Sequence, residues 1–291
     1  MPELHLTLHP CPPFDFGQSL AFAEGFTPTR AETGTANGTL TRLLSLEGRA
    51  VELNVREGGE ALRLHARSEG PLDGAALLDR ARFWLSLDDD LGPFYRLAEA
   101  DPPFAPVLAR LHGYHQVKFV TPFEALAWAL LTQRTPQAVA RRLKRTLSDT
   151  IGPALDGKHA FPEPGAVAEA SAAQLADLMP ALKAGRLQAA ARAFSKTPED
   201  WLRRAPLDEV RAWLLALPGV GPFSASLTLI RGLGRMAAGV EGGGMDAAHL
   251  LDAARQVYGP GLDAADLGRL AEHYGDQRGW WAHYLRAGAR D

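Results

Sequence analysis

The chain has 291 residues, of which 46% are hydrophobic and 22% charged, and its formal net charge at pH 7 is −3. This composition is that of an ordinary globular protein, and the charge excludes a protein that coats nucleic acid by bulk positive charge. The single cysteine, Cys11, excludes a disulfide framework and a four-cysteine metal or iron–sulfur cluster.

The N-terminus shows no secretory signal, since Met1-Pro2-Glu3-Leu4 is acidic and no long apolar run follows it. No stretch approaches the roughly 20 apolar residues that a membrane-spanning helix needs. We therefore expect a cytoplasmic, nucleoid-associated protein that has no membrane partner.

The first third of the chain reads as a small sheet. Leu4, Leu6 and Leu8 alternate with polar residues, which is the period of a half-buried strand. Two dipeptides, Asn37-Gly38 and Glu47-Gly48, are typical of hairpin turns. Further strands are expected around these turns and over 62–66, and a helix is expected over 75–87.

The rest of the sequence is nearly all helical in pattern. The predicted fold class is therefore α+β, mostly α, with an N-terminal α/β sheet domain at 1–100 and a two-lobed helical region at 101–291. Thr121-Pro122-Phe123-Glu124 reads as a capping box that begins an apolar helix. The next helix, 137–147, carries Arg141, Arg142, Lys144 and Arg145 and is either a solvated face or a phosphate contact.

A helix-hairpin-helix is predicted at 208–233. Apolar helical patterns run into and out of Leu217-Pro218-Gly219-Val220-Gly221-Pro222-Phe223-Ser224-Ala225. Glycine accommodates a tight reversal of the backbone, and proline is favoured at the first position of a helix. The free N–H groups at such a helix start suit a phosphate, so this element positions nucleic acid without reading its sequence.

The hairpin, the Gly-rich loop Gly239–Met245 and Asp246 follow one another in an order that resembles the helix-hairpin-helix-GPD superfamily of DNA glycosylases. The string Pro12-Pro13-Phe14-Asp15-Phe16, followed by Leu20-Ala21-Phe22, resembles the N-terminal domain of AlkA-type 3-methyladenine DNA glycosylases. The resemblance covers nearly the whole chain. It is most specific at 217–225 and at 246.

The resemblance implies the roles of the site residues. Asp246 is the expected catalytic carboxylate. Gln133 and Arg134 follow an apolar helix where the family plugs the minor groove, although a bulky apolar residue commonly stands at the Arg134 position. The residues expected to contact the DNA backbone are Leu217, Gly219, Gly221, Phe223 and Ser224, and the expected base pocket consists of Phe14, Phe16, Phe22 and Trp280.

Several alternatives stay open at this point. Asp246 lies 246 − 223 = 23 residues after Phe223, somewhat farther than is usual in the family, so Glu241 is a rival carboxylate. The phenylalanines can instead be core residues. Because Trp280 and Trp281 are adjacent on one helix, we expect at least one of them to face a cleft or the surface.

We therefore predict a DNA base-excision glycosylase that flips out alkylated bases and leaves an abasic site. Bifunctional relatives carry a nucleophilic lysine where this sequence has Phe223, so hydrolysis by water is expected. The alternative is a non-catalytic hairpin protein that binds damaged or structured DNA. The expected partner is double-stranded DNA containing damaged bases, bound by a monomer. No cofactor and no metal site are expected, apart from the monovalent cation that the hairpin of relatives can hold.

Overall fold

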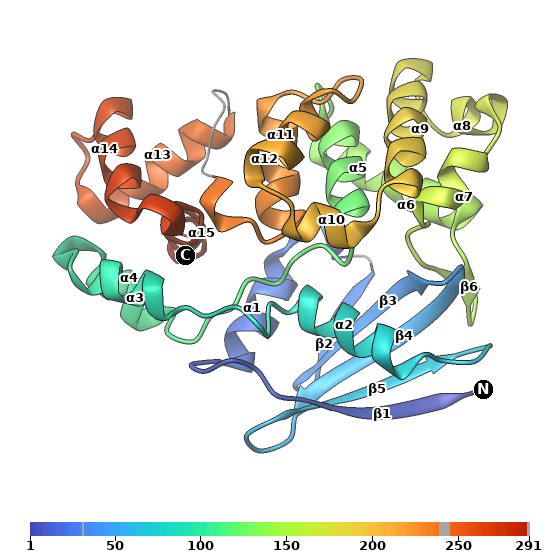
Figure 1. Ribbon diagram of the computed structural model, residues 1–291, viewed down its shortest axis with the longest axis horizontal. Helices are drawn as coiled ribbons and strands as arrows, with labels where there is room; N and C mark the ends of the chain where they lie inside the picture. The colour runs from blue at the N-terminus through green and yellow to red at the C-terminus, as the bar shows by residue number, and fades with distance from the viewer. Residues whose placement is uncertain (31, 239–244, 290–291) are drawn as a thin grey trace.

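The computed structural model describes residues 1–30, 32–238 and 245–289, with only the backbone at 245–247. Its main sheet has five antiparallel strands in the order β1-β5-β4-β3-β2 (Figure 1). The strands are β1 (Glu3–Leu8), β2 (Thr33–Ala36), β3 (Thr39–Leu46), β4 (Arg49–Glu57) and β5 (Leu62–Ser68). A small ribbon, β6 (Ala154–Leu155) and β7 (Lys158–His159), accompanies it.

Both predicted hairpin turns are confirmed. Asn37 and Gly38 have φ of 53° and 69° between β2 and β3, and Glu47 and Gly48 have φ of 52° and 74° between β3 and β4. Two successive positive φ values are the geometry of the turn that matches the twist of paired strands. The turn residues therefore set the register of the central strands.

One face of the sheet is apolar and packs against two helices, α1 (Phe16–Gly25) and α2 (Gly74–Trp84). Leu40, Leu53 and Leu64 from the strands meet Phe16 and Trp84 in this core. Phe16 is only 2% exposed, so its predicted place in the base pocket is wrong. The strand period sends every second residue to this core. The opposite face is mainly polar, except where Leu43 and Ala50 form a small buried cluster with Leu155 and Ala160.

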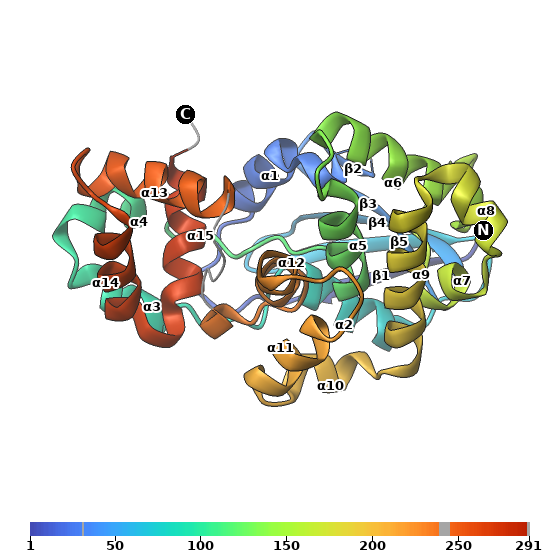
Figure 2. The ribbon, with the colours of Figure 1, turned by 90° about the horizontal axis from the view of Figure 1, so that it is seen from above.

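The remaining helices form two groups, one above the sheet and one beside it, with the hairpin between them (Figures 1 and 2). One group contains α5 (Pro122–Thr132), α6 (Gln137–Ile151), α7 (Pro164–Glu169), α8 (Ala172–Leu178) and α9 (Ala181–Lys196). The other contains α3 (Gly92–Glu99), α4 (Ala105–Arg110), α13 (Met245–Tyr258), α14 (Ala264–Tyr274) and α15 (Arg278–Gly288). Between them lie α10 (Glu199–Arg204), α11 (Leu207–Leu215), α12 (Pro222–Leu227) and the π-helix η3 (Thr228–Gly232). The described part of the chain also contains four short 3-10 helices, η1 (Thr27–Thr29), η2 (Pro102–Phe104), η4 (Met236–Ala238) and η5 (Gly275–Gln277).

Segments distant in sequence share the second group of helices. Phe94 of α3 packs against Trp280 and Tyr284 of α15, so the residues before position 100 contribute to the core of the C-terminal helices.

Within the part of the chain that the structure describes, no helix has the length and apolar character needed to cross a membrane.

The helix α5 is the buried axis of the first group, and its N-terminus differs from the prediction. Thr121 Oγ1 accepts from the Glu124 N–H at 3.1 Å, as a cap should. The Glu124 carboxylate does not complete the capping box. It instead accepts from Arg42 Nη2 at 2.7 Å and lies 2.8 Å from Lys144 Nζ. A buried charge needs an opposite charge nearby. The buried Glu124 carboxylate therefore pairs with these two cations and does not complete the capping box.

The buried ion cluster, defined as Arg42, Glu124, Lys144 and Glu32, joins the sheet to α5 and α6. Lys144 Nζ also lies 2.9 Å from Glu32 Oε1, and Arg42 lies 3.7 Å from Glu32 Oε2. The two cations and two carboxylates cancel formally. Lys144 is 1% exposed and therefore does not contact phosphate, whereas Arg141, Arg142 and Arg145 on the same helix are exposed.

Candidate nucleic-acid interface and active site

The predicted hairpin is present between α11 and α12. Gly219 has φ of +80°, the left-handed conformation that favours glycine. A Cβ there would lie 2.4 Å from Arg186 Cδ, so a side chain would also force the Arg186 side chain to shift. Gly221 is different, because its φ of −102° suits any residue and a Cβ would meet nothing within 4 Å. Gly221 therefore faces open space at the start of α12.

The exposed surface of the hairpin is partly apolar. Phe223 is 38% exposed and Leu215 41% exposed, while Leu217 is half-buried. In the first turn of α12 the N–H groups have no carbonyl one turn earlier to bond within the helix. Ser224 is the exception among the predicted contacts, because it is only 2% exposed. Its side chain is buried against the α5–α6 loop and cannot reach a phosphate.

A hydrogen-bond network ties the α5–α6 loop to the hairpin. Gln133 Nε2 donates to Gly219 O at 2.7 Å and to Ser224 Oγ at 3.3 Å. Arg186 Nη1 donates to Gln133 Oε1 at 3.0 Å, so both ends of the amide are satisfied. Gln133 therefore positions the loop against the hairpin, and its predicted part in the minor-groove plug stays a prediction.

The same loop leaves Arg134 at its apex. Arg134 is exposed and has φ of +50°, which is unusual for a residue with a side chain. Beneath it, Lys183 Nζ donates to the carbonyls of Leu130, Leu131 and Gln133 at 2.8–3.0 Å and closes the C-terminus of α5. The strained backbone is thus held on a rigid base, an arrangement common at functional sites.

An aromatic cluster, defined as Phe22, Phe26, Tyr114 and His283, lies where α1, η3 and α15 meet. Phe22 stacks on Phe26 at 5.2 Å and lies 5.6 Å from both Tyr114 and His283. Tyr114 OH and His283 Nε2 are 2.9 Å apart. The Arg231 guanidinium lies 4.8 Å and 4.7 Å from the Phe22 and Phe26 ring centroids. These rings therefore already hold a planar cation.

Of the predicted pocket residues, only Phe22 lies in this cluster. Phe14 packs edge-on against His115 and against the sheet core. Trp280 is 4% exposed and Trp281 1% exposed, so the expectation that one of them faces a cleft or the surface is wrong. Other helices enclose α15, and Trp281 Nε1 is satisfied by Tyr258 OH at 2.9 Å, which lets a polar aromatic side chain be buried.

Sequence reasoning missed Phe26, Tyr114 and His283. His283 stands three residues after Trp280, on the same face of the helix, and that spacing was a usable signal. Tyr114 comes from the irregular connection before α5, where periodicity carries no information.

Beyond η3 the chain leads to the predicted catalytic residue. The backbone places Asp246 in the first turn of α13, one residue after the helix begins at Met245. The first turn of a helix favours a carboxylate. The side chain of Asp246 and all of Glu241 lie outside the described residues.

The sequence match is to a DNA-3-methyladenine glycosylase and the fold is that of solved DNA glycosylases, so the predicted resemblance to DNA glycosylases is confirmed. No protein-family model matches the chain. The DNA-3-methyladenine glycosylase of Bacillus subtilis (strain 168) is 30% identical over 155 residues, which is 51% of this chain and 51% of that protein. The match thus spans about half the length of this curated relative.

Two solved structures share the fold over most of its length. The 3-methyladenine DNA-glycosylase from Archaeoglobus fulgidus superposes with a TM-score of 0.73 at 20% identity, covering 97% of each chain. The Clostridium acetobutylicum 8-oxoguanine glycosylase/lyase, solved with double-stranded DNA containing cytosine opposite 8-oxoG, gives a TM-score of 0.66 at 16% identity and covers 88% of this chain and 86% of that one. The α+β, mostly helical fold class predicted from the sequence is therefore confirmed.

Substitution of the two hairpin glycines should affect different properties, DNA affinity for Gly221 and stability for Gly219. Gly221→Asp places a negative charge in open space beside the proposed phosphate site, so affinity for any duplex should fall about tenfold or more while the melting temperature stays nearly constant. Fluorescence anisotropy with damaged and undamaged duplexes measures this change. Gly219→Ala is the matched variant. It should lower stability by about 1–2 kcal/mol, because φ of +80° is strained for alanine. Unchanged affinity in Gly221→Asp would remove the hairpin from the interface.

Arg134→Ala separates a plug from a phosphate contact. If Arg134 fills the space of an extruded base, its loss should slow base release about tenfold or more and weaken binding to an abasic product less. Single-turnover rates and anisotropy on the same duplexes provide the two readings. Arg141→Ala on the exposed face of α6 is the control. Equal losses in rate and in binding would mark Arg134 as an ordinary phosphate contact.

Proposed function

We propose that the protein is a DNA glycosylase that extrudes an alkylated base from duplex DNA and hydrolyses its N-glycosidic bond. The observation that carries this proposal is the hydrogen bond from Gln133 to Gly219, which joins the Arg134 loop and the hairpin into one surface. The hairpin would hold the backbone, and Arg134 would enter the duplex. From that surface the chain continues through η3 to the helix that contains Asp246.

The proposed chemistry needs a single carboxylate. Breaking a glycosidic bond builds positive charge on the sugar, and a carboxylate held nearby stabilises it. A glycosidase that acts on a neutral leaving group uses a second, acidic residue. An N-alkylated purine is already cationic and departs without that proton. Asp246 alone would therefore suffice, by stabilising the sugar and orienting water.

The aromatic cluster is our proposed base pocket. Electron-rich ring faces attract a planar cation, and Phe22 and Phe26 hold the Arg231 guanidinium in that manner. A cationic alkylated base has the same charge and planarity. The cluster lies where α1 and η3 meet α15, a helix of the second group.

We further propose that water, not an amine, attacks the sugar. In bifunctional relatives the nucleophilic lysine stands in the hairpin at the position that Phe223 occupies in this chain. Burial and the charge of Arg186 lower the pKa of the nearby Lys183, but its Nζ donates to three main-chain carbonyls at the end of α5. An ammonium has three N–H donors, so all of them are engaged.

The second candidate function is a DNA-binding protein that does not cut the glycosidic bond. The hairpin and the Arg134 loop would serve it equally well. A carboxylate in the first turn of α13 favours the enzyme, because a pure binding protein gains nothing from a negative charge near phosphates.

The deciding experiment incubates the protein with duplexes that carry single defined lesions, including 3-methyladenine, 7-methylguanine and 8-oxoguanine. We expect release of the methylated bases, with strand breaks only after heat or alkali. Strand cleavage without such treatment, or a covalent adduct trapped by borohydride, would contradict the hydrolytic step. Tight binding to all these duplexes with no released base would establish the binding protein instead.

A further inference from the structure

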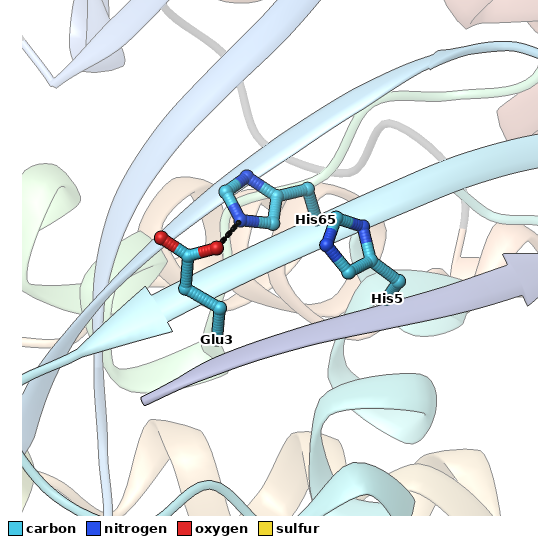
Figure 3. Close-up of side chains that lie close together, drawn as sticks. All are labelled: Glu3, His5 and His65. Carbon is cyan, nitrogen blue, oxygen red and sulfur yellow. Dashed lines mark ion pairs between the residues drawn. The ribbon is translucent and has the colours of Figure 1, made fainter. Parts of the chain in front are cut away.

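A second group of chemically reactive side chains lies far from the hairpin, on the polar face of the sheet. Strand β1 pairs antiparallel with β5, and this register sets His5 directly opposite His65. Glu3 precedes His5 by two residues. Because side chains alternate along a strand, Glu3, His5 and His65 project from the same face (Figure 3).

The three side chains converge. One ligand atom from each, a carboxylate oxygen or an imidazole nitrogen, lies within 4.8 Å of the other two. His65 Nε2 is 3.4 Å from Glu3 Oε2, and the two imidazole rings stack at 4.7 Å with an angle of 21° between their planes (Figure 3). Two imidazoles and a carboxylate are a common donor set for zinc.

One atom of the group lacks a hydrogen-bonding partner. Among the described residues, His65 Nε2 is shielded from solvent and makes no hydrogen bond, since its contact with Glu3 lacks hydrogen-bond geometry. Shielded polar atoms are normally satisfied, so such an exception needs an explanation. A metal ion between His65 Nε2 and the carboxylate would provide the missing partner.

We propose that Glu3, His5 and His65 bind one divalent transition-metal ion, with Zn²⁺ as the preferred ion. Bond lengths of about 2.0–2.2 Å place the ligands of a tetrahedral zinc roughly 3.3–3.6 Å apart. The present spacing therefore closes by rotation of the exposed Glu3 and His5 side chains, with the His5 ring tilting out of its stack on His65. Imidazole ligands disfavour Ca²⁺ and Mg²⁺, which take oxygen.

The surroundings leave the fourth ligand position to water. A surface hollow of about 590 Å³ opens beside the two imidazoles and is also lined by Asn54, Arg56 and Arg63. Arg63, which precedes His65 by two residues on β5, donates to Thr7 Oγ1, and Arg67, which follows His65 by two residues, is paired with Glu52 at 2.7 Å and with Asp156. The positive charge of Arg67 is thereby largely neutralised, which lowers the repulsion that an incoming cation would meet.

The expected consequence is structural. The strand β1 forms one edge of the sheet and pairs only with β5 among the described strands. An ion held by Glu3 and His5 on one strand and by His65 on the other would clip this edge in place. Any ligand that binds only the folded chain raises its stability in proportion to the logarithm of ligand concentration over Kd.

The test uses the untagged full-length chain, stripped of metal with EDTA and titrated with ZnCl₂ at pH 7.5 by calorimetry. We expect one ion per chain, a higher melting temperature with zinc, and Co²⁺ visible absorption bands of a four-coordinate site. Zinc affinity should fall at least about tenfold in His5→Ala, His65→Ala and Glu3→Gln. Lowering the pH to 5.5 should weaken binding, because protonated imidazole is no ligand.

The control is His9→Ala, which removes an exposed histidine just beyond β1 and should leave binding unchanged. His65→Gln tests the same ligand with a side chain that preserves polarity, and circular dichroism confirms that each variant is folded. A stoichiometry near zero would overturn the proposal. Zinc binding that survives both histidine substitutions, or that is lost in His9→Ala, would also overturn it by placing the ion elsewhere.

Discussion

Asp246→Asn is expected to slow release of an alkylated base by about a hundredfold or more. Removing a charge aligned with the transition state costs roughly 3–4 kcal/mol, and each 1.36 kcal/mol corresponds to a tenfold change in rate. Asparagine has nearly the same size, and position 246 lies in the first turn of α13, where a short polar side chain is tolerated. The substitution therefore tests the charge and not the folding of the helix.

Two measurements separate catalysis from binding. Single-turnover base release from a methylated duplex should fall in Asp246→Asn, whereas affinity for a damaged duplex should be retained or should increase, because a carboxylate near phosphates repels them. Glu241→Gln is the control and should leave base release nearly intact. The reverse pattern would place the catalytic carboxylate in the Gly-rich loop. If neither variant slows base release, the hairpin serves only to bind DNA.

Glu124→Ala is expected to destabilise the fold by about 3–5 kcal/mol, the usual result of breaking a buried ion pair from one side. Glu124 is 1% exposed and lies between Arg42 and Lys144. Its removal would leave two buried cations with Glu32 as the one carboxylate near them among the described residues. Urea unfolding followed by circular dichroism measures the change. Asp200→Ala, which breaks the exposed pair with Arg204, is the matched control and should change stability little.

The same buried ion cluster predicts that the stability of the fold depends on pH. Burial alone would raise the pKa of Glu124, but the charges of Arg42 and Lys144 outweigh burial and hold that pKa well below its ordinary value of 4.5. A carboxylate whose pKa is lowered in the folded state stabilises the protein above its unfolded pKa, and that contribution is lost as the pH falls. The stability gap between the wild type and Glu124→Gln should therefore shrink below about pH 4.5. A gap that is constant down to pH 3 would contradict this linkage.

The amino-acid sequence determined the local features. The two-residue turns at 37–38 and 47–48 and the left-handed Gly219 follow from backbone conformations that few residues adopt. Alternation in Leu4, Leu6 and Leu8 predicted β1 because a strand buries every second side chain. Such rules act over a few residues, so one sequence suffices to apply them, and the hairpin string was specific enough to indicate the fold.

Only the tertiary structure decided which residues are buried and which meet. Two adjacent tryptophans lie in the core because α15 is surrounded by helices from both ends of the chain. Ser224 and Gln133 bond each other instead of facing solvent, and the Glu124 carboxylate turns from its cap to Arg42 and Lys144. In each case a tertiary contact or enclosure by distant helices outweighs the local preference, because burial and charge pairing outweigh a single cap or turn.

The proposed metal site shows the same division. Alternation along β1 puts Glu3 and His5 on one face, and this much follows from the sequence. The third ligand, His65, comes from a strand about 60 residues later, and the antiparallel register of β1 with β5 brings it opposite His5. Period-2 patterns assign faces but not partners, since pairing is set by the packing of the whole sheet.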